Sequence, residues 1–101
     1  MPEITIQYQP GRLTAVSSAG KIMGYVTFPQ IRKGLVNIDR VQIVPEYRLA
    51  DVETILLDAL LLHLKQQGMK AALTSPAAQR HVANNPLWKA VLPDSMHMTA
   101  H

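Results

Sequence analysis

The chain has 101 residues, of which 48% are hydrophobic and 17% are charged, and its formal net charge is +3. This length suits one modest domain and excludes a repeat array or a multidomain machine. The apolar fraction can form a core and excludes a largely disordered chain. We therefore expect a single domain over residues 1–92 and a C-terminal tail over residues 93–101.

The residue types present disfavour a membrane-spanning helix and exclude cysteine chemistry. A membrane-spanning helix needs about 20 apolar residues, whereas the best run here, residues 55–64, contains Asp58 and His63. The first residues do not resemble a signal peptide. The sequence contains no cysteine, which excludes disulfides, thiolate metal sites and thiol catalysis. We expect a cytoplasmic protein with no membrane partner.

Positive charge is scattered along the chain and is not gathered on one predicted face. A nucleic-acid-binding domain usually clusters its cations and interleaves them with aromatic residues. A solvated surface is therefore favoured over a nucleic-acid interface. The scattered cations of the first half are Arg12, Lys21, Arg32, Lys33, Arg40 and Arg48.

The first half of the chain has the pattern of β-strands. Apolar alternation and turn residues predict strands over residues 4–8, 13–16, 22–28 and 35–44. Four strands at such short spacing are typical of an antiparallel meander. Pro45 ends the fourth strand because it has no backbone N–H to donate.

A long helix follows over residues 52–67, which contain neither glycine nor proline. Asp51 is expected to cap its N-terminus and Gly68 to end it. Leu57, Leu61 and Leu62 widen its apolar stripe beyond what one sheet face requires. Two explanations stay open, because either neighbouring elements cover these leucines or they form the contact of a homodimer.

The last third of the chain predicts a buried fifth strand over residues 69–74 and a short helix from Pro76 to residue 83, capped by Ser75. Another turn or two is expected over residues 86–91. The strand–helix–strand stretch has the length of a crossover, which makes the fourth and fifth strands parallel. The fold class is thus α+β, and its ligand crevice is expected at residues 43–53 and 74–76.

Single polar residues are weak candidates for catalysis. Ser75 lacks a G-x-S-x-G context, so an N-cap is favoured over a nucleophile. Trp88 is favoured as a packing anchor over a ligand platform. The imperfectly alternating trio Asp39, Arg40 and Gln42 is favoured as strand surface over an acid/base set. No metal site is expected from the spacing of His63, His81, His97 and His101.

The order of elements resembles the core of the GNAT superfamily of acetyl-CoA-dependent N-acetyltransferases, and in particular its compact branch, which lacks the usual first helices. The likeness covers about residues 4–92 and is carried by three blocks in register. V-P-P-E-x-R-G-x-G-[IV]-[GA] corresponds to IVPEYRLADVE at residues 43–53. G-L-K-V-x-P-x-C-P corresponds to GMKAALTSP at residues 68–76, and H-P-E-Y to NPLW at residues 85–88.

The resemblance implies acetyl-CoA as cofactor and an amine as acyl acceptor. The pantetheine arm would pair with backbone groups of the fourth strand where it separates from the fifth, and the pyrophosphate would lie at the helix N-terminus. Ser75, at the position of the family's cysteine, and Glu46 are the catalytic candidates, and Asp39 or a water molecule in the cleft are open alternatives for the base. The implied cofactor-binding residues are Ile43, Val44, Arg48, Leu49, Ala50, Asp51, Val52 and Glu53.

This chain departs from the family pattern at the pyrophosphate loop. Leu49 and Asp51 replace both glycines, and Glu53 replaces a small residue. A carboxylate about 4 Å from a phosphate oxygen costs on the order of 4 kcal/mol at a dielectric of 20, or about a thousandfold in affinity. Arg48 could offset part of this cost. Two functions therefore stay open: an N-acetyltransferase, or a non-catalytic GNAT-fold binding or assembly module that has lost CoA binding.

Overall fold

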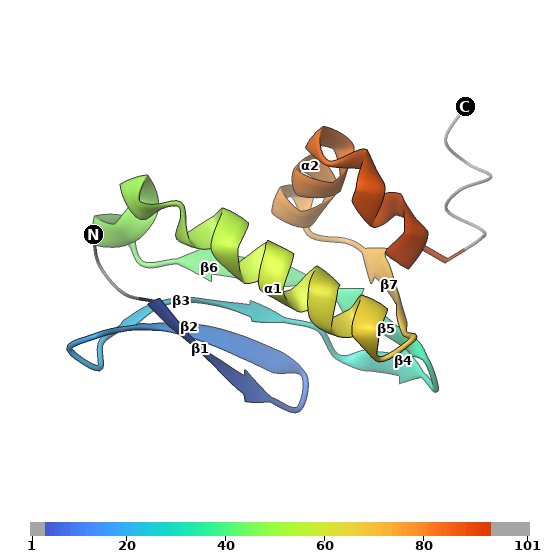
Figure 1. Cartoon of the computed structure of the whole chain (residues 1–101), viewed down its shortest axis with the longest axis horizontal. Helices are drawn as coiled ribbons and strands as arrows, with labels where there is room; N and C mark the ends of the chain where they lie inside the picture. Colours follow the sequence, from blue (N-terminus) through green and yellow to red (C-terminus); the bar gives the residue numbers. More distant parts are fainter. Residues whose placement is uncertain (1–3, 94–101) are drawn as a thin grey trace.

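The computed structural model describes residues 4–93, so the expected tail lies outside the described residues from residue 94 onward. Two small sheets lie side by side, and the long helix α1 (Val52–Gln66) crosses over them (Figure 1). Helix α2 (Pro76–Asn84) and the 3₁₀ helix η2 (Pro86–Val91) contact α1 and complete the core. This arrangement confirms the α+β class expected from the sequence.

The larger sheet is antiparallel and has the order β1-β2-β3-β6. The pairs run β1 to β2, β2 to β3 and β3 to β6, as a meander requires. Leu13 and Val26 pair across β2 and β3 and are fully buried, whereas the flanking residues point to the opposite face. The strands are Ile4–Gln9, Arg12–Ser17, Ile22–Thr27 and Arg40–Ile43.

The smaller sheet has the order β4-β5-β7 and contains the parallel pair. Strand β5 (Leu35–Ile38) pairs with β7 (Lys70–Leu73) in parallel, which confirms the predicted crossover. A short strand that the sequence did not indicate, β4 (Gln30–Arg32), forms a hairpin with β5.

The predicted fourth strand, residues 35–44, is wrong as a single strand. It breaks at Asp39 into β5 and β6, which belong to different sheets. The buried side chains change parity at the break, from Val36 and Ile38 before it to the half-buried Val41 and Ile43 after it. An extra residue at Asp39 therefore keeps apolar side chains on the core face of both sheets.

Helix α1 has a wide apolar stripe because both of its sides are covered. Val52, Leu56, Leu60 and Leu64 are buried, and so are the surplus residues Leu57 at 0% and Leu61 at 1% exposure. Contacts with both sheets, α2 and η2 surround the helix. Neighbouring elements thus cover two of the three surplus leucines, and only Leu62, at 47%, is exposed.

The helix ends follow the sequence signals except at Asp51. Gly68 has a φ of 70°, the left-handed conformation that ends a helix, and the buried Ser75 hydroxyl accepts a hydrogen bond from the Ala78 N–H at 3.4 Å. Asp51 does not cap α1 with its side chain, contrary to expectation. Its φ of 56° and ψ of 27° differ from the extended conformation of an N-cap, so the carboxylate is not directed at the first N–H groups.

Within residues 4–93, no helix has the length and apolarity required to cross a membrane.

Candidate functional site

The outer edge of β6 is the most open backbone near the expected crevice. β6 ends its sheet, because β7 pairs with β5 and leaves β6 without a strand on its second side among the described strands. The last backbone hydrogen bonds between the β5 and β7 segments are made by the Ile38 carbonyl, which accepts from the N–H groups of Thr74 at 3.2 Å and Ser75 at 3.1 Å. Beyond Ile38 the two segments separate, and β6 presents a free edge.

The pairing register shows which backbone groups of β6 point to this edge. The Val44 N–H donates to the Met23 carbonyl at 2.9 Å, so this pair is hydrogen-bonded across β3 and β6. Hydrogen-bonded and non-hydrogen-bonded pairs alternate along an antiparallel ladder. The backbone groups of Val41 and Ile43 therefore point away from β3, whereas Val44 is turned towards it. The expected role of Ile43 is compatible with this geometry, and Val41 joins it.

A pocket of about 450 Å³ adjoins the free edge. Strand β6, the first turn of α1 and the first half of α2 form its walls. Of the residues expected to form the crevice, only Ile43 and Glu53 line this pocket, whereas residues 44–52 and 74–76 do not. Its lining residues are Val41, Gln42, Ile43, Glu53, Ala77 and Arg80.

Two opposite charges line this pocket. Glu53 is half-buried in the first turn of α1, and Arg80 is exposed on α2, one helical turn after Ala77. Sequence reasoning identified Glu53 and missed Arg80. The i, i+3 spacing of Ala77 and Arg80 could have shown that both residues lie on one face of the helix that starts at Pro76. Only the packing of α2 shows that this face meets β6.

The segment expected to form the pyrophosphate loop begins with the 3₁₀ helix η1 (Pro45–Ala50). It contributes the backbone of Arg48, Leu49 and Ala50, and it ends at Asp51, which is in the left-handed region. Glycine adopts this region without cost, and aspartate tolerates it better than most other residues. Asp51 therefore retains the backbone conformation typical of a glycine. Its side chain makes no capping hydrogen bond, so it does not compete for the N–H groups of α1.

The other predicted site residues lie around the pocket without lining it. Val52 is fully buried and can contribute only its backbone. Glu46 is exposed on η1. Ser75 is 3% exposed and its hydroxyl caps α2, so the structural role favoured from the sequence is confirmed. The structure therefore brings together Ile43, Glu53 and the N-terminus of α1, but it does not bring Glu46 and Ser75 into the pocket.

His81 and Trp88, which the sequence favoured as structural residues, both contact other elements of the fold. The His81 Nε2 lies 2.7 Å from the Asp58 Oδ1, and the Trp88 indole N–H donates to the same oxygen at 3.1 Å. Trp88 packs against the core, as expected of an anchor. No group of three or more metal-ligating side chains occurs in the described part of the chain. His97 and His101 lie outside that part.

Comparison with solved structures identifies the fold. A GCN5-like protein from Staphylococcus aureus superposes with a TM-score of 0.73 at 16% identity, over 92% of this chain and 91% of that one. A GNAT-family acetyltransferase from the same species (TM-score 0.59, 19% identity) and Ard1 from Thermoplasma volcanium (0.60, 16%) match 73% and 74% of this chain.

The chain spans only 50% and 54% of the last two proteins, whereas it matches nearly all of the GCN5-like protein. No family model and no curated protein sequence matches the chain. Identities this low establish the fold alone. The chain has the fold of the GNAT superfamily, in a compact form.

Proposed function

We propose that this protein is an N-acetyltransferase that transfers an acetyl group from acetyl-CoA to an amine. The observation that carries the proposal is the pocket at the free edge of β6, at the point where the two sheets of a GNAT fold separate. An extended amide-containing ligand can add to such an edge as an extra strand would.

The residues around the pocket fit acetyl-CoA, with one opposing charge. The outward backbone groups of Val41 and Ile43 can pair with the amides of the pantetheine arm. The N–H groups at the start of α1 favour an anion, and Arg80 supplies a cation for phosphate oxygens. Glu53 opposes phosphate binding, but it is half-buried and partly screened by water, so its cost falls below that of a fully buried carboxylate.

Acetyl-CoA, when bound, supplies an acyl group activated as a thioester. The transfer joins the amine nitrogen to the acyl carbon and breaks the carbon–sulfur bond. A base takes up the amine proton and a proton is returned to the sulfur, so no further reactant is needed. Backbone groups from Arg48 to Val52 are the proposed phosphate-side contacts. Glu46 is proposed to accept the amine proton through solvent, because it is exposed on η1 and does not line the pocket itself. Ser75 is proposed to support the acyl end by holding the start of α2.

Ligand binding to the purified protein tests the proposal. A ligand at 100 times its dissociation constant stabilises a fold by about 2.7 kcal/mol, which a thermal shift with acetyl-CoA or CoA detects. Loss of a charge-assisted contact, about 1.5 to 3 kcal/mol, predicts that Arg80→Gln weakens CoA binding at least tenfold. Glu53→Gln should strengthen it. Arg32→Gln, the same change on exposed β4, is the matched control and should bind as the unmodified chain does.

A non-catalytic module is the second candidate, supported by the carboxylates Asp51 and Glu53 at the anion-binding end of α1. A homodimer contact through the helix leucines is less favoured than the sequence suggested, because Leu57 and Leu61 are buried within the chain. No stabilisation by millimolar acetyl-CoA would reject the enzyme and leave the module. Stabilisation by acetyl-CoA, together with acetyl transfer to an amine, would reject the module.

A further inference from the structure

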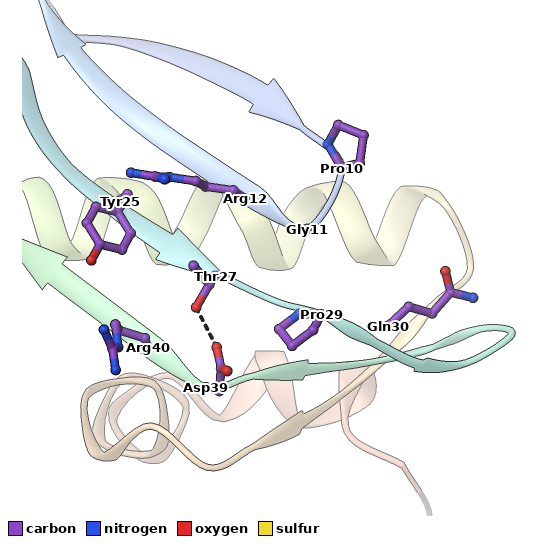
Figure 2. A pocket seen from close by; sticks show the side chains of 9 residues that line it. All are labelled: Pro10, Gly11, Arg12, Tyr25, Thr27, Pro29, Gln30, Asp39 and Arg40. Atoms are coloured by element: carbon purple, nitrogen blue, oxygen red, sulfur yellow. Dashed lines mark hydrogen bonds between the residues drawn. The ribbon is translucent and has the colours of Figure 1, made fainter.

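A second pocket, of about 720 Å³, lies on the face of the larger sheet that points away from the core (Figure 2). Its position follows from strand alternation, because Leu13 and Val26 point to the core and their neighbours Arg12 and Thr27 point to the other face. This surface carries two arginines and one aspartate. The lining residues are Pro10, Gly11, Arg12, Tyr25, Thr27, Pro29, Gln30, Asp39 and Arg40.

The two arginines flank one threonine across three strands. Arg12 of β2 and Arg40 of β6 are both paired with Thr27 of β3, so the three residues form one row. Neighbouring strands lie about 4.8 Å apart, which separates the two arginine Cα atoms by about 10 Å. The row therefore places two cations on the outer face of the sheet, one on each side of Thr27.

Arg12 is held in place without using its hydrogen-bonding groups. Its guanidinium carbon lies 4.2 Å from the centre of the Tyr25 ring, a cation–π contact. Its Nε is buried and has no hydrogen-bond partner among the described residues. A ligand in the pocket cannot reach this buried atom, so only the terminal nitrogens of the Arg12 guanidinium can contact a bound anion.

Asp39 lines this pocket at the point where β5 ends and β6 begins. The Thr27 hydroxyl donates to the Asp39 Oδ1, which leaves the second carboxylate oxygen for a ligand. Asp39 directly follows Ile38, whose carbonyl makes the last contact with the β7 segment. Arg40 lines the outer pocket and the next residue, Val41, lines the cleft. The two pockets are therefore lined by consecutive residues of β6 and share no lining residue.

We propose that the outer pocket holds the acyl acceptor and that the acceptor is an amino acid. Its carboxylate binds between Arg12 and Arg40, and its amine lies at Asp39, next to Ile38, where the β5 and β7 segments separate. The charges match, because two cations and one anion line the pocket and an α-amino acid carries one of each. The assignment rests on the proposed acetyl transfer, since it names the amine that the transfer would use.

Binding is tested without acetyl-CoA, by following the amide signals of ¹⁵N-labelled protein. The probes are amino acids and their counterparts that lack the carboxylate: L-phenylalanine and phenethylamine, L-leucine and isopentylamine, L-lysine and cadaverine. At least one amino acid should shift the signals of residues 11–12, 25–27 and 39–40 and saturate. Its counterpart should bind at least tenfold more weakly, because a charge-assisted pair is lost.

Charge variants show whether the arginines recognise the carboxylate. Arg40→Gln changes an exposed side chain and should weaken amino-acid binding about tenfold or more, whereas Arg32→Gln should not. Arg12→Gln should act in the same direction, and the amide spectrum shows whether that variant is folded. Equal binding of an amino acid and its counterpart, or of inorganic phosphate as tightly as the amino acid, would overturn the assignment.

The outcome for this pocket can be separated from that for the proposed function. Stabilisation by acetyl-CoA with no amino acid bound at the outer pocket would overturn the acceptor assignment and leave the acetyltransferase proposal standing. An amino acid bound at the outer pocket with no acetyl-CoA binding would overturn acetyl transfer and, with it, the assignment of that ligand as an acceptor.

Discussion

Asp58 joins three elements at one oxygen atom, and its removal should measurably destabilise the fold. From the middle of α1 it accepts from His81 on α2 at 2.7 Å and from the Trp88 indole on η2 at 3.1 Å. Hydrogen bonds to a charged group contribute about 1.5 to 3 kcal/mol each. The Asp58 side chain is 49% exposed, so water can replace part of what is lost, and we take the low end of that range for the pair.

The expected cost of Asp58→Ala is about 2 kcal/mol. Two hydrogen bonds at the low end sum to about 3 kcal/mol, and alanine returns about 0.6 kcal/mol through its higher helix propensity. Water that binds the freed His81 and Trp88 nitrogens lowers the remaining cost further. For a domain of this size, 1 kcal/mol shifts the Tm by about 4–8 °C, so the melting temperature should fall by about 8–16 °C.

Urea denaturation followed by Trp88 fluorescence measures this cost directly, because Trp88 is the only tryptophan in the chain. Asp58→Asn should lose about half as much, since an amide oxygen in the place of Oδ1 can still accept from both donors but without the carboxylate charge. Gln66→Ala, on the exposed end of α1, is the control and should stay within about 0.5 kcal/mol. A change below about 0.5 kcal/mol for Asp58→Ala would refute the view that this carboxylate joins α1 to α2 and η2.

Two further substitutions test the surroundings of the cleft. Gly24→Ala places a Cβ 2.8 Å from the Gln42 carbonyl oxygen and 2.8 Å from the Ile43 Cδ1, so β6 must shift; we expect a loss of about 1–3 kcal/mol in urea unfolding and weaker acetyl-CoA binding. Unchanged stability would mean that β6 yields without cost. Ser75→Ala removes the cap of α2 and should cost about 0.5–1 kcal/mol by thermal unfolding, because the bond is long. A loss of acetyl transfer far beyond this instability would indicate a direct role of the hydroxyl at the acyl group.

Local signals in the sequence were sufficient for most elements. Alternation and turn residues located three strands, and Gly68, Ser75 and Pro76 correctly marked helix ends, since each acts through its own backbone or a neighbour's. The break at Asp39 was visible only as imperfect alternation between Ile38 and Val41. Period-2 patterning cannot say whether such a defect is a bulge, a change of sheet or the end of burial.

The sequence located only part of the candidate site. Topology alone placed Ile43 and Glu53 near the crevice, because a crossover unit brings the end of its strand to the start of its helix. Arg80 and the row Arg12–Thr27–Arg40 could not be found from sequence, since these residues meet through the packing of α2 and the register of three strands.

The sequence by itself excluded thiol chemistry, because it contains no cysteine, and its scattered charge of +3 disfavoured a nucleic-acid surface. The apolar pattern likewise determined an α+β fold with a crossover helix, because burial of one face per element depends on local periodicity. Only the tertiary structure determined where the charged side chains lie relative to the helix N-terminus and to one another. Asp51 in the left-handed region leaves the start of α1 uncapped by its side chain, and strand pairing sets Arg12 and Arg40 on either side of Thr27. Such effects depend on dihedral angles and on contacts between segments far apart in the chain, which composition and spacing do not encode.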